Sequence, residues 1–179
     1  MATKIALLRA VNVGGNTKVA MSDLRQLLND LGMKNSRTLL QTGNLVFDSA
    51  GTEESELEGA LATEMNRRLG LRTDVMVREV SEWLAAIARN PFSQQAKEDP
   101  SHLVVVFLKS LPLADSVLSL DSRSGPERVS AWGRQLFATY PDGIGRSQLT
   151  MSVIERQLGI RGTARNWNTV LKLAVLAQE

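Results

Sequence analysis

Polar residues that could bind an anion gather at three places in this sequence, each where a strand-like segment gives way to a helical one. The N-terminus of a helix presents unpaired N–H groups and a positive potential, so such junctions suit phosphates and carboxylates. The first cluster follows the apolar run 4–10 and combines two cations, an amide and two glycines: Arg9, Asn12, Gly14, Gly15 and Lys18. It would serve as a cradle for an anion or as a tight loop with Lys18 in solvent. The second interpretation is the stronger, because paired glycines are common in loops.

The second cluster lies between a strand-like segment that ends at Tyr140 and a helical segment that carries Leu149. It brings a carboxylate, a guanidinium and a hydroxyl close together in the chain: Asp142, Gly143, Gly145, Arg146 and Ser147. Arg146 and Ser147 would place a guanidinium and a hydroxyl beside an oxyanion. Ser147 would equally serve as a helix-entry residue that bonds the first turn, and the sequence leaves both roles open.

The third cluster precedes the final apolar helix and is unusually polar for that position. It surrounds Trp167 with hydroxyl, guanidinium and amide groups: Thr163, Arg165, Asn166 and Asn168. Arg165 would hold a carboxylate or phosphate beside Asn166, the expected N-cap of the helix. In the alternative interpretation Arg165 belongs to a structural ion pair and Trp167 anchors the helix in the core. Spacing alone does not separate the two.

The residue inventory excludes several familiar chemistries. The chain has no cysteine, which rules out disulfides, thiolate–zinc sites and a cysteine nucleophile. His102 is the single histidine, and no serine is aligned with it for a catalytic triad. A P-loop motif is absent, and the acidic run 53–58 is expected to form a solvated helix start whose carboxylates do not converge. We therefore predict no metal site and no cofactor.

The elements that must position these clusters follow a regular order in the first half of the chain. Apolar spacing and turn residues predict a strand over 4–10, a helix over 21–31, a hairpin of 37–41 with 45–48, a helix over 52–69 and a strand over 73–80. Gly43 and Asn44 lie at the hairpin turn, and Arg78 is expected to point outward from the last strand. This βαββαβ order is the ferredoxin-like arrangement.

The second half repeats this order less clearly. After a connecting helix over 81–89, the patterns predict a strand over 102–108, a helix over 113–120, paired strands over 127–132 and 134–140, a helix with Ile154 and Leu158, and a final helix after Asn166. The fold class is therefore α+β, with two ferredoxin-like (alpha-beta plait) βαββα subdomains in tandem. Their expected bounds are 1–80 and 101–179, joined by a connecting helix and loop over 81–100.

The composition indicates a globular protein of the cytoplasm. Of the 179 residues, 43% are hydrophobic and 22% are charged. No apolar run approaches the roughly 20 residues that cross a bilayer, and the N-terminus lacks the pattern of a signal peptide. The net charge is only +2, with a local excess of cations after Gly145. This excess favours an anionic ligand, but it is far weaker than the basic surface of a committed nucleic-acid binder.

Short motifs within these clusters resemble one protein family, the one catalogued as domain of unknown function 1697. The motifs are Leu-Arg-Ala-Val-Asn-Val-Gly-Gly at 8–15, Gln-Thr-Gly-Asn-Leu-Val-Phe at 41–47, Tyr-Pro-Asp-Gly-Ile-Gly-Arg-Ser at 140–147 and Thr-Ala-Arg-Asn-Trp-Asn-Thr at 163–169. The resemblance runs from Ile5 to about Ala177. It implies a bacterial-type cytosolic protein with two alpha-beta plait subdomains and no established activity. Thr42 and Gln148 stand where the family usually has a serine and a lysine.

The leading hypothesis is a module that binds a small ligand bearing phosphate or carboxylate. Cations at strand–helix junctions would hold the charge, namely Arg9, Lys18, Arg146 and Arg165. Amide side chains would add hydrogen bonds, namely those of Asn12, Asn44, Asn166 and Asn168. One alternative is an enzyme in which Asp142 or Tyr140 moves a proton.

Two further alternatives are an interaction module whose polar motifs are purely structural and a weak binder of single-stranded nucleic acid. The sequence leaves open whether the three clusters meet in space, and it leaves the oligomeric state open as well.

Overall fold

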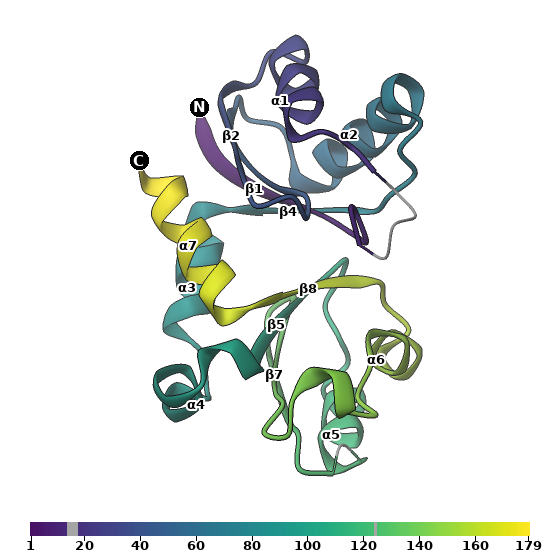
Figure 1. The fold of residues 1–179 in the computed structure, drawn as a ribbon, viewed down its shortest axis with the longest axis vertical. Helices are drawn as coiled ribbons and strands as arrows, with labels where there is room; N and C mark the ends of the chain where they lie inside the picture. Colours follow the sequence, from purple (N-terminus) through teal and green to yellow (C-terminus); the bar gives the residue numbers. More distant parts are fainter. Residues whose placement is uncertain (14–17, 124) are drawn as a thin grey trace. The chain divides into compact units, whose positions relative to one another are not determined.

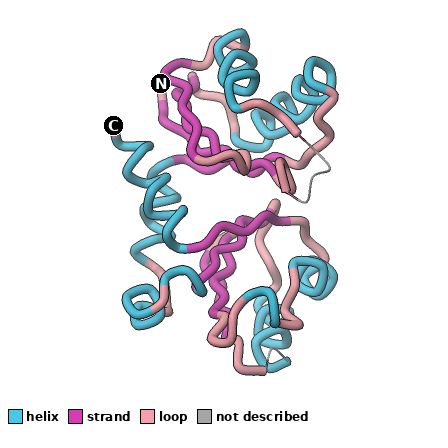
Figure 2. Tube along the Cα trace, in the orientation of Figure 1, coloured by secondary structure: helices cyan, strands magenta, loops and turns pink. Residues whose placement is uncertain are grey.

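A computed structural model describes residues 1–13, 18–123 and 125–179. The chain divides into two compact units. The first consists of 1–84 together with 173–179, and the second of 85–172. Each unit holds one four-stranded antiparallel sheet. In Figure 2 the strands of each unit form one layer, and helices form a second layer beside it.

The first unit has the βαββαβ order expected from its sequence. Its elements are β1 (Ala2–Leu8), α1 (Met21–Asp30), β2 (Lys34–Leu39), β3 (Asn44–Ser49), α2 (Glu54–Leu69) and β4 (Val75–Glu79). The strand order is β2-β3-β1-β4, which places the first strand in the middle and the last one at an edge. Gly43 ends the turn of the hairpin with φ +77°, a conformation that favours glycine, and a Cβ there would lie 2.7 Å from Leu8 Cβ.

The core of the first unit lies between one face of its sheet and the two helices. Alternate residues of β1, including Ala6 and Leu8, point to this face, and Leu24 of α1 and Leu61 of α2 pack against them. Figure 1 shows α1 and α2 on the same side of this sheet. The apolar stripes at helical spacing in the sequence are the surfaces that these helices bury.

The chain segment that connects β4 to the first strand of the second sheet contains more helix than the sequence indicates. It begins with α3 (Val80–Ala88), the connecting helix that the apolar pattern predicts. It continues with α4 (Ser93–Glu98) and a single 3-10 turn, η1 (Pro100–His102). Helix α4 is not predicted from the sequence, because its residues are Ser, Gln, Gln, Ala, Lys and Glu, which form no apolar stripe.

The second unit repeats the topology of the first. Its elements are β5 (Leu103–Leu108), α5 (Ala114–Arg123), β6 (Arg128–Trp132), β7 (Gln135–Thr139), η2 (Ile144–Arg146), α6 (Met151–Leu158) and β8 (Gly162–Asn166). The final helix, α7 (Trp167–Gln178), begins in this unit, and its residues from Leu173 onward belong to the first unit. The strand order β6-β7-β5-β8 matches that of the first sheet position by position. The α+β class with two tandem ferredoxin-like subdomains is therefore confirmed. Strand β8 is missing from the predicted elements, because Gly-Thr-Ala-Arg-Asn has no apolar alternation.

Two charged residues near the edge strand β4, Arg78 and Glu58, are buried, contrary to what the sequence predicts. Arg78, expected to point outward, has no exposed surface, because the face of the sheet opposite α1 and α2 is also buried there. Its guanidinium donates to Val77 O at 2.8 Å, and Nη1 lies 3.9 Å from Glu58 Oε1. Glu58, expected on a solvated helix start, is buried as well and accepts the Val77 N–H at 2.8 Å.

Among the described residues, none of the helices combines the length and the apolar character that crossing a membrane requires.

Candidate functional site

The three polar clusters are divided between the two units. The first cluster belongs to the first unit, and the second and third belong to the second unit. Gly14 and Gly15 lie outside the described residues.

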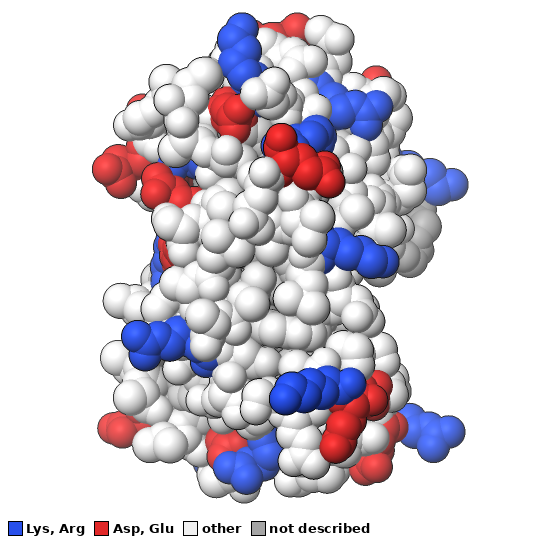
Figure 3. All heavy atoms as spheres, turned by 90° about the vertical axis from the view of Figure 1, so that its left-hand side faces the viewer, with Lys and Arg blue, Asp and Glu red and all other residues white. Residues whose placement is uncertain are grey.

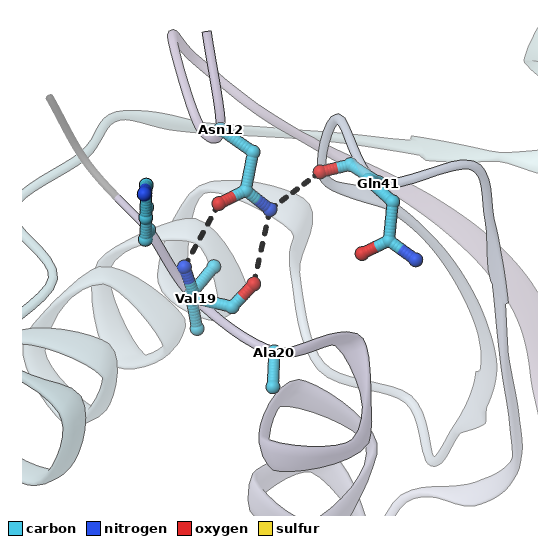
Figure 4. Close-up of a pocket in the computed structure, with 5 residues that line it drawn as sticks. Asn12, Val19, Ala20 and Gln41 are labelled. Atoms are coloured by element: carbon cyan, nitrogen blue, oxygen red, sulfur yellow. Dashed lines mark hydrogen bonds between the residues drawn. The ribbon is translucent and has the colours of Figure 1, made fainter. Parts of the chain in front are cut away.

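Asn12 of the first cluster holds its own loop closed. Its side-chain Nδ2 donates to Val19 O at 3.0 Å and to Gln41 O at 2.6 Å, and its Oδ1 accepts the Val19 N–H at 2.9 Å (Figure 4). The residue has φ +54°, which asparagine tolerates better than most residues. The Asn12 carboxamide is thus occupied by backbone groups of the loop and of the neighbouring hairpin turn.

An open hollow of about 430 Å³ lies next to this carboxamide, beside the start of α1. Its walls come from Asn12, Lys18, Val19, Ala20 and Gln41, and Lys18 is exposed. Arg9 does not line this hollow. It is half-buried, and its backbone bonds to Asp74 O and to the Thr73 hydroxyl.

Asn44 of the first unit is fully buried at the start of β3. Its Nδ2 donates to Leu39 O at 2.8 Å and to the Thr42 hydroxyl at 3.1 Å, so the side chain bridges the two strands of the hairpin. The hydroxyl that Thr42 retains at a position usually occupied by serine is therefore used within the turn.

The second cluster forms the loop from β7 to α6. Gly143 has φ +91°, whereas Gly145 does not need a positive φ. Ser147 accepts the Leu149 N–H at 2.9 Å, while Thr150 caps α6 by accepting the Val153 N–H at 3.3 Å. The helix-entry role considered for Ser147 therefore belongs to Thr150. Asp142 and Arg146 are exposed in this loop.

Tyr140 is buried beneath this loop and supports it. The Tyr140 hydroxyl donates to Leu149 O at 2.9 Å, which ties the end of β7 to the start of α6. Burial, with a smaller contribution from the negative charge of Glu127, raises the pKa of Tyr140 to about 12. A hydroxyl with this pKa and this bond is poorly suited to proton transfer at neutral pH.

We expect Tyr140 to make the protein less stable in alkali. An unfolded tyrosine ionises near its ordinary pKa of about 10, whereas the folded one ionises near 12, so only the unfolded state loses its proton between these values. Stability from Tyr140 is complete below about pH 10 and is lost as the pH rises toward 12, by roughly 2 kcal/mol. Denaturant unfolding of wild type and Tyr140→Phe from pH 9 to 12 measures this. An equally steep alkaline loss in the variant would contradict it.

The third cluster lies at the end of β8 and the start of α7. Asn166 Oδ1 accepts the Thr169 N–H at 3.0 Å, which confirms Asn166 as the N-cap of the final helix. Thr163 is buried, and its hydroxyl accepts a hydrogen bond from Arg165 Nη1 at 2.9 Å. Asn168 is exposed on the first turn of α7.

Arg165 lies on the face of the second sheet that faces away from α5 and α6. Ala164, its neighbour in β8, packs on the core beneath those helices, and alternation places Arg165 on the other face. Desolvation lowers the pKa of Arg165 to about 10, so its guanidinium is still protonated at neutral pH. Arg165 does not line the hollow that contains Arg146.

That hollow, of about 580 Å³, is formed by the loop from β7 to α6 together with the end of α5 and one side of α6. We call it the arginine hollow after the three guanidinium side chains that line it, Arg123, Arg146 and Arg156. Leu120, Leu149 and Val153 supply apolar wall. Of the sequence candidates it contains Asp142, Arg146 and Ser147.

None of the three arginines forms an ion pair or a side-chain hydrogen bond with another described residue. All three are exposed, as are Arg67, Arg68 and Arg128, but only the latter three pair with carboxylates. The lining of the hollow also includes two carboxylates, Glu127 and Asp142, so its charge is positive by one unit, and a net positive potential attracts anions.

Sequence reasoning missed Arg123 and Arg156 as members of this site. Arg156 lies on a predicted helix, where a lone cation is ordinary surface. Arg123 is the last residue of α5 and is followed by a Gly-Pro turn at 125–126, so a cation beside a tight turn was the one available signal. The described residues hold no group of three or more His, Asp or Glu side chains placed to bind a metal ion.

A family of proteins and a solved structure are similar to this chain. The family model described as "Protein of unknown function (DUF1697)" matches residues 1–137. The solved structure of the conserved bacterial protein SP0830 from Streptococcus pneumoniae is similar over 98% of both chains, with a TM-score of 0.78 and 20% sequence identity. At this identity the likeness shows the fold alone. No curated protein matches the chain.

Proposed function

Because the chain belongs to the DUF1697 family, whose description assigns no activity, we propose a function from the geometry of the second unit: it binds a small anionic ligand in the arginine hollow. The ligand carries a phosphate or a carboxylate. The observation that supports this is the presence of three guanidinium groups at one hollow without carboxylate partners among the described residues.

Guanidinium groups suit this role because their planar N–H donors match the oxygens of phosphate and carboxylate. The hollow, at about 580 Å³, falls within the size range of small-molecule sites. Apolar walls from Leu120, Leu149 and Val153 would contact the uncharged part of the ligand. The Ser147 hydroxyl accepts the Leu149 N–H through its oxygen, which leaves its own hydrogen to donate to a bound anion.

A small ligand is favoured over nucleic acid. Ferredoxin-like modules that bind RNA stack bases on aromatic side chains of an open sheet face. Both faces of the central strand β5 are buried in this chain, including Phe107. On the face shown in Figure 3, basic and acidic side chains are interspersed rather than gathered into one basic patch.

Titration calorimetry with inorganic phosphate and pyrophosphate tests the proposal on wild type and Arg146→Gln. We expect saturable binding that weakens as salt is raised, because exposed charges are screened. Loss of one charge-assisted hydrogen bond, worth roughly 1.5 kcal/mol or more, should raise Kd about tenfold in the variant.

Arg72→Gln is the matched control. Arg72 is also exposed, forms no ion pair among the described residues and lies in the first unit, so its removal changes the net charge equally. Equal weakening by both substitutions would mean a diffuse charge effect and would refute a site in the arginine hollow. Absence of any binding by wild type would refute the function itself.

A further inference from the structure

The arginine hollow also contains a buried carboxylate, that of Glu127. The residue follows the turn after α5, lines the hollow and is only 5% exposed. Its Oε2 lies 3.5 Å from the position that a Cβ on Gly125 would occupy, and Gly125 lines the same hollow. The carboxylate is also close enough to the Tyr140 hydroxyl to affect its ionisation.

Within the described residues this carboxylate accepts no hydrogen bond and joins no ion pair. The nearby Tyr140 hydroxyl has a single hydrogen, which it donates to Leu149 O. None of the three arginines of the hollow is within ion-pair distance of Glu127. The carboxylate oxygens are not sealed from the hollow, so they are open acceptors that the fold itself leaves without a donor.

We propose that Glu127 recognises a nitrogen donor on the same ligand whose anionic group the arginines bind. This inference rests on the proposed function of the hollow. The ligand then has two parts, a phosphate or carboxylate near the arginines and an amino or ammonium N–H group at the carboxylate. Amino-sugar phosphates and nucleotides whose base presents an amino edge are the two sources with this chemistry, and both fit the size of the hollow.

The arrangement discriminates among anions. An amino group at Glu127 donates to this open acceptor, whereas a ligand without a donor there would cover the carboxylate, displace its water and leave it unpaired. Sites built around a buried polar group reject analogues that lack its partner more strongly than apolar pockets reject a missing methylene. Simple phosphate should therefore bind more weakly than a phosphate ester with a correctly placed amine.

Two matched ligand pairs test this in the wild-type protein. Glucosamine 6-phosphate is compared with glucose 6-phosphate, and GMP with IMP, which lacks the 2-amino group. We expect the amino member of one pair to bind at least tenfold more tightly, and that pair identifies the source. Equal affinities in both pairs, with phosphate binding still dependent on Arg146, would overturn this inference and leave the proposed function standing. Loss of Arg146-dependent phosphate binding would overturn both.

Glu127→Gln provides the second measurement. The amide should abolish the preference for the amino ligand, while phosphate affinity stays equal or rises, because a negative charge has left the hollow. The variant should also melt at or above the temperature of wild type, because the carboxylate forms no hydrogen bond or ion pair that the amide would lose. Asp115→Asn, which removes an exposed carboxylate of α5 outside the hollow, should change neither property. A lower melting temperature for Glu127→Gln would show a structural role and overturn the inference.

Discussion

Replacing Glu58 with alanine should lower the free energy of unfolding by about 4 kcal/mol, because breaking a buried charge pair from one side leaves the other charge uncompensated. Glu58 and Arg78 are both buried, with Glu58 Oε1 3.9 Å from Arg78 Nη1. Glu82 Oε1 lies 3.5 Å from Arg78 Nε and would remain as a partner. Glu82 is half-buried and follows Arg78 by four residues in the chain. It therefore compensates only part of the charge that Arg78 loses when Glu58 is removed.

Glu58 has a second role that raises this cost. Strand β4 lies at the edge of the first sheet, where alternate N–H groups have no strand to pair with. Glu58 Oε1 accepts the Val77 N–H at 2.8 Å, and Glu54 Oε1, one helical turn earlier, accepts the Glu79 N–H at 2.7 Å. The residues of α2 thus cover the edge with carboxylates at the spacing of the free donors.

Urea unfolding of Glu58→Ala, Glu58→Gln and Glu56→Ala separates these contributions. Glutamine keeps an oxygen for the Val77 N–H and loses only the charge, so its cost should be clearly smaller than that of alanine. Glu56 is an exposed residue of the same helix and forms no side-chain bond among the described residues, so Glu56→Ala should change stability by less than about 0.5 kcal/mol. Similar values for Glu58→Ala and Glu56→Ala would disprove a structural role for the pair.

The acidic start of α2 shows where sequence reasoning reaches its limit. A helix that begins with several glutamates is normally solvated, and the favourable effect of acids on the first turn is a local property. Whether Glu58 is buried depends on the position of an edge strand that follows it by about twenty residues in the chain. A single sequence does not say how close in space the two lie. The same holds for Arg78, since period-two alternation predicts which face a residue occupies but not whether that face is covered.

The helices and strands themselves are easier to predict from the sequence than their burial. Apolar periodicity predicts most of the described helices and strands, because burial of one face drives them to form, and the turn residues 43–44 predict the polar strand β2. The helix and the strand that the sequence does not predict, α4 and β8, are polar as well. Strand β8 forms because Thr163 pairs with Phe107 and Arg165 with Val105 of the most apolar strand, so the neighbour rather than its own sequence determines its state.

The candidate site can be predicted from the sequence only in part. The sequence predicts Arg146 and Ser147 as site residues, because a cation and a hydroxyl beside glycines form a local pattern. It does not predict Arg123 and Glu127, because they join the site only when the turn after α5 folds next to the loop after β7. Asn12 and Tyr140 were selected for their chemistry, and the structure gives each of them hydrogen bonds that hold a loop in place.

Asn12→Ala should lower the free energy of unfolding by about 3 kcal/mol, because it removes three hydrogen bonds of about 1 kcal/mol each. Those bonds join the two ends of the loop through Val19 and fasten it to the hairpin turn through Gln41. Alanine is also less tolerant than asparagine of φ +54°, which adds a smaller backbone term. Asn66→Ala, at an exposed position of α2 without a side-chain bond among the described residues, serves as the matched control.

Asn12→Asp tests the same hydrogen bonds by replacing the donor amide with a negatively charged oxygen. The aspartate still accepts the Val19 N–H, but its second oxygen faces Val19 O and Gln41 O, to which the amide donated. This repulsion should make the aspartate variant less stable than wild type at pH 7. It raises the folded-state pKa of the new carboxyl above its unfolded value of about 4, so the loss should shrink as the pH falls toward 4, where the protonated carboxyl again donates a hydrogen bond. Phosphate affinity at the arginine hollow should stay unchanged in both Asn12 variants, because Asn12 lies in the other unit. If either variant lost phosphate binding while remaining folded, Asn12 would belong to the ligand site and the structural role argued for its carboxamide would be wrong.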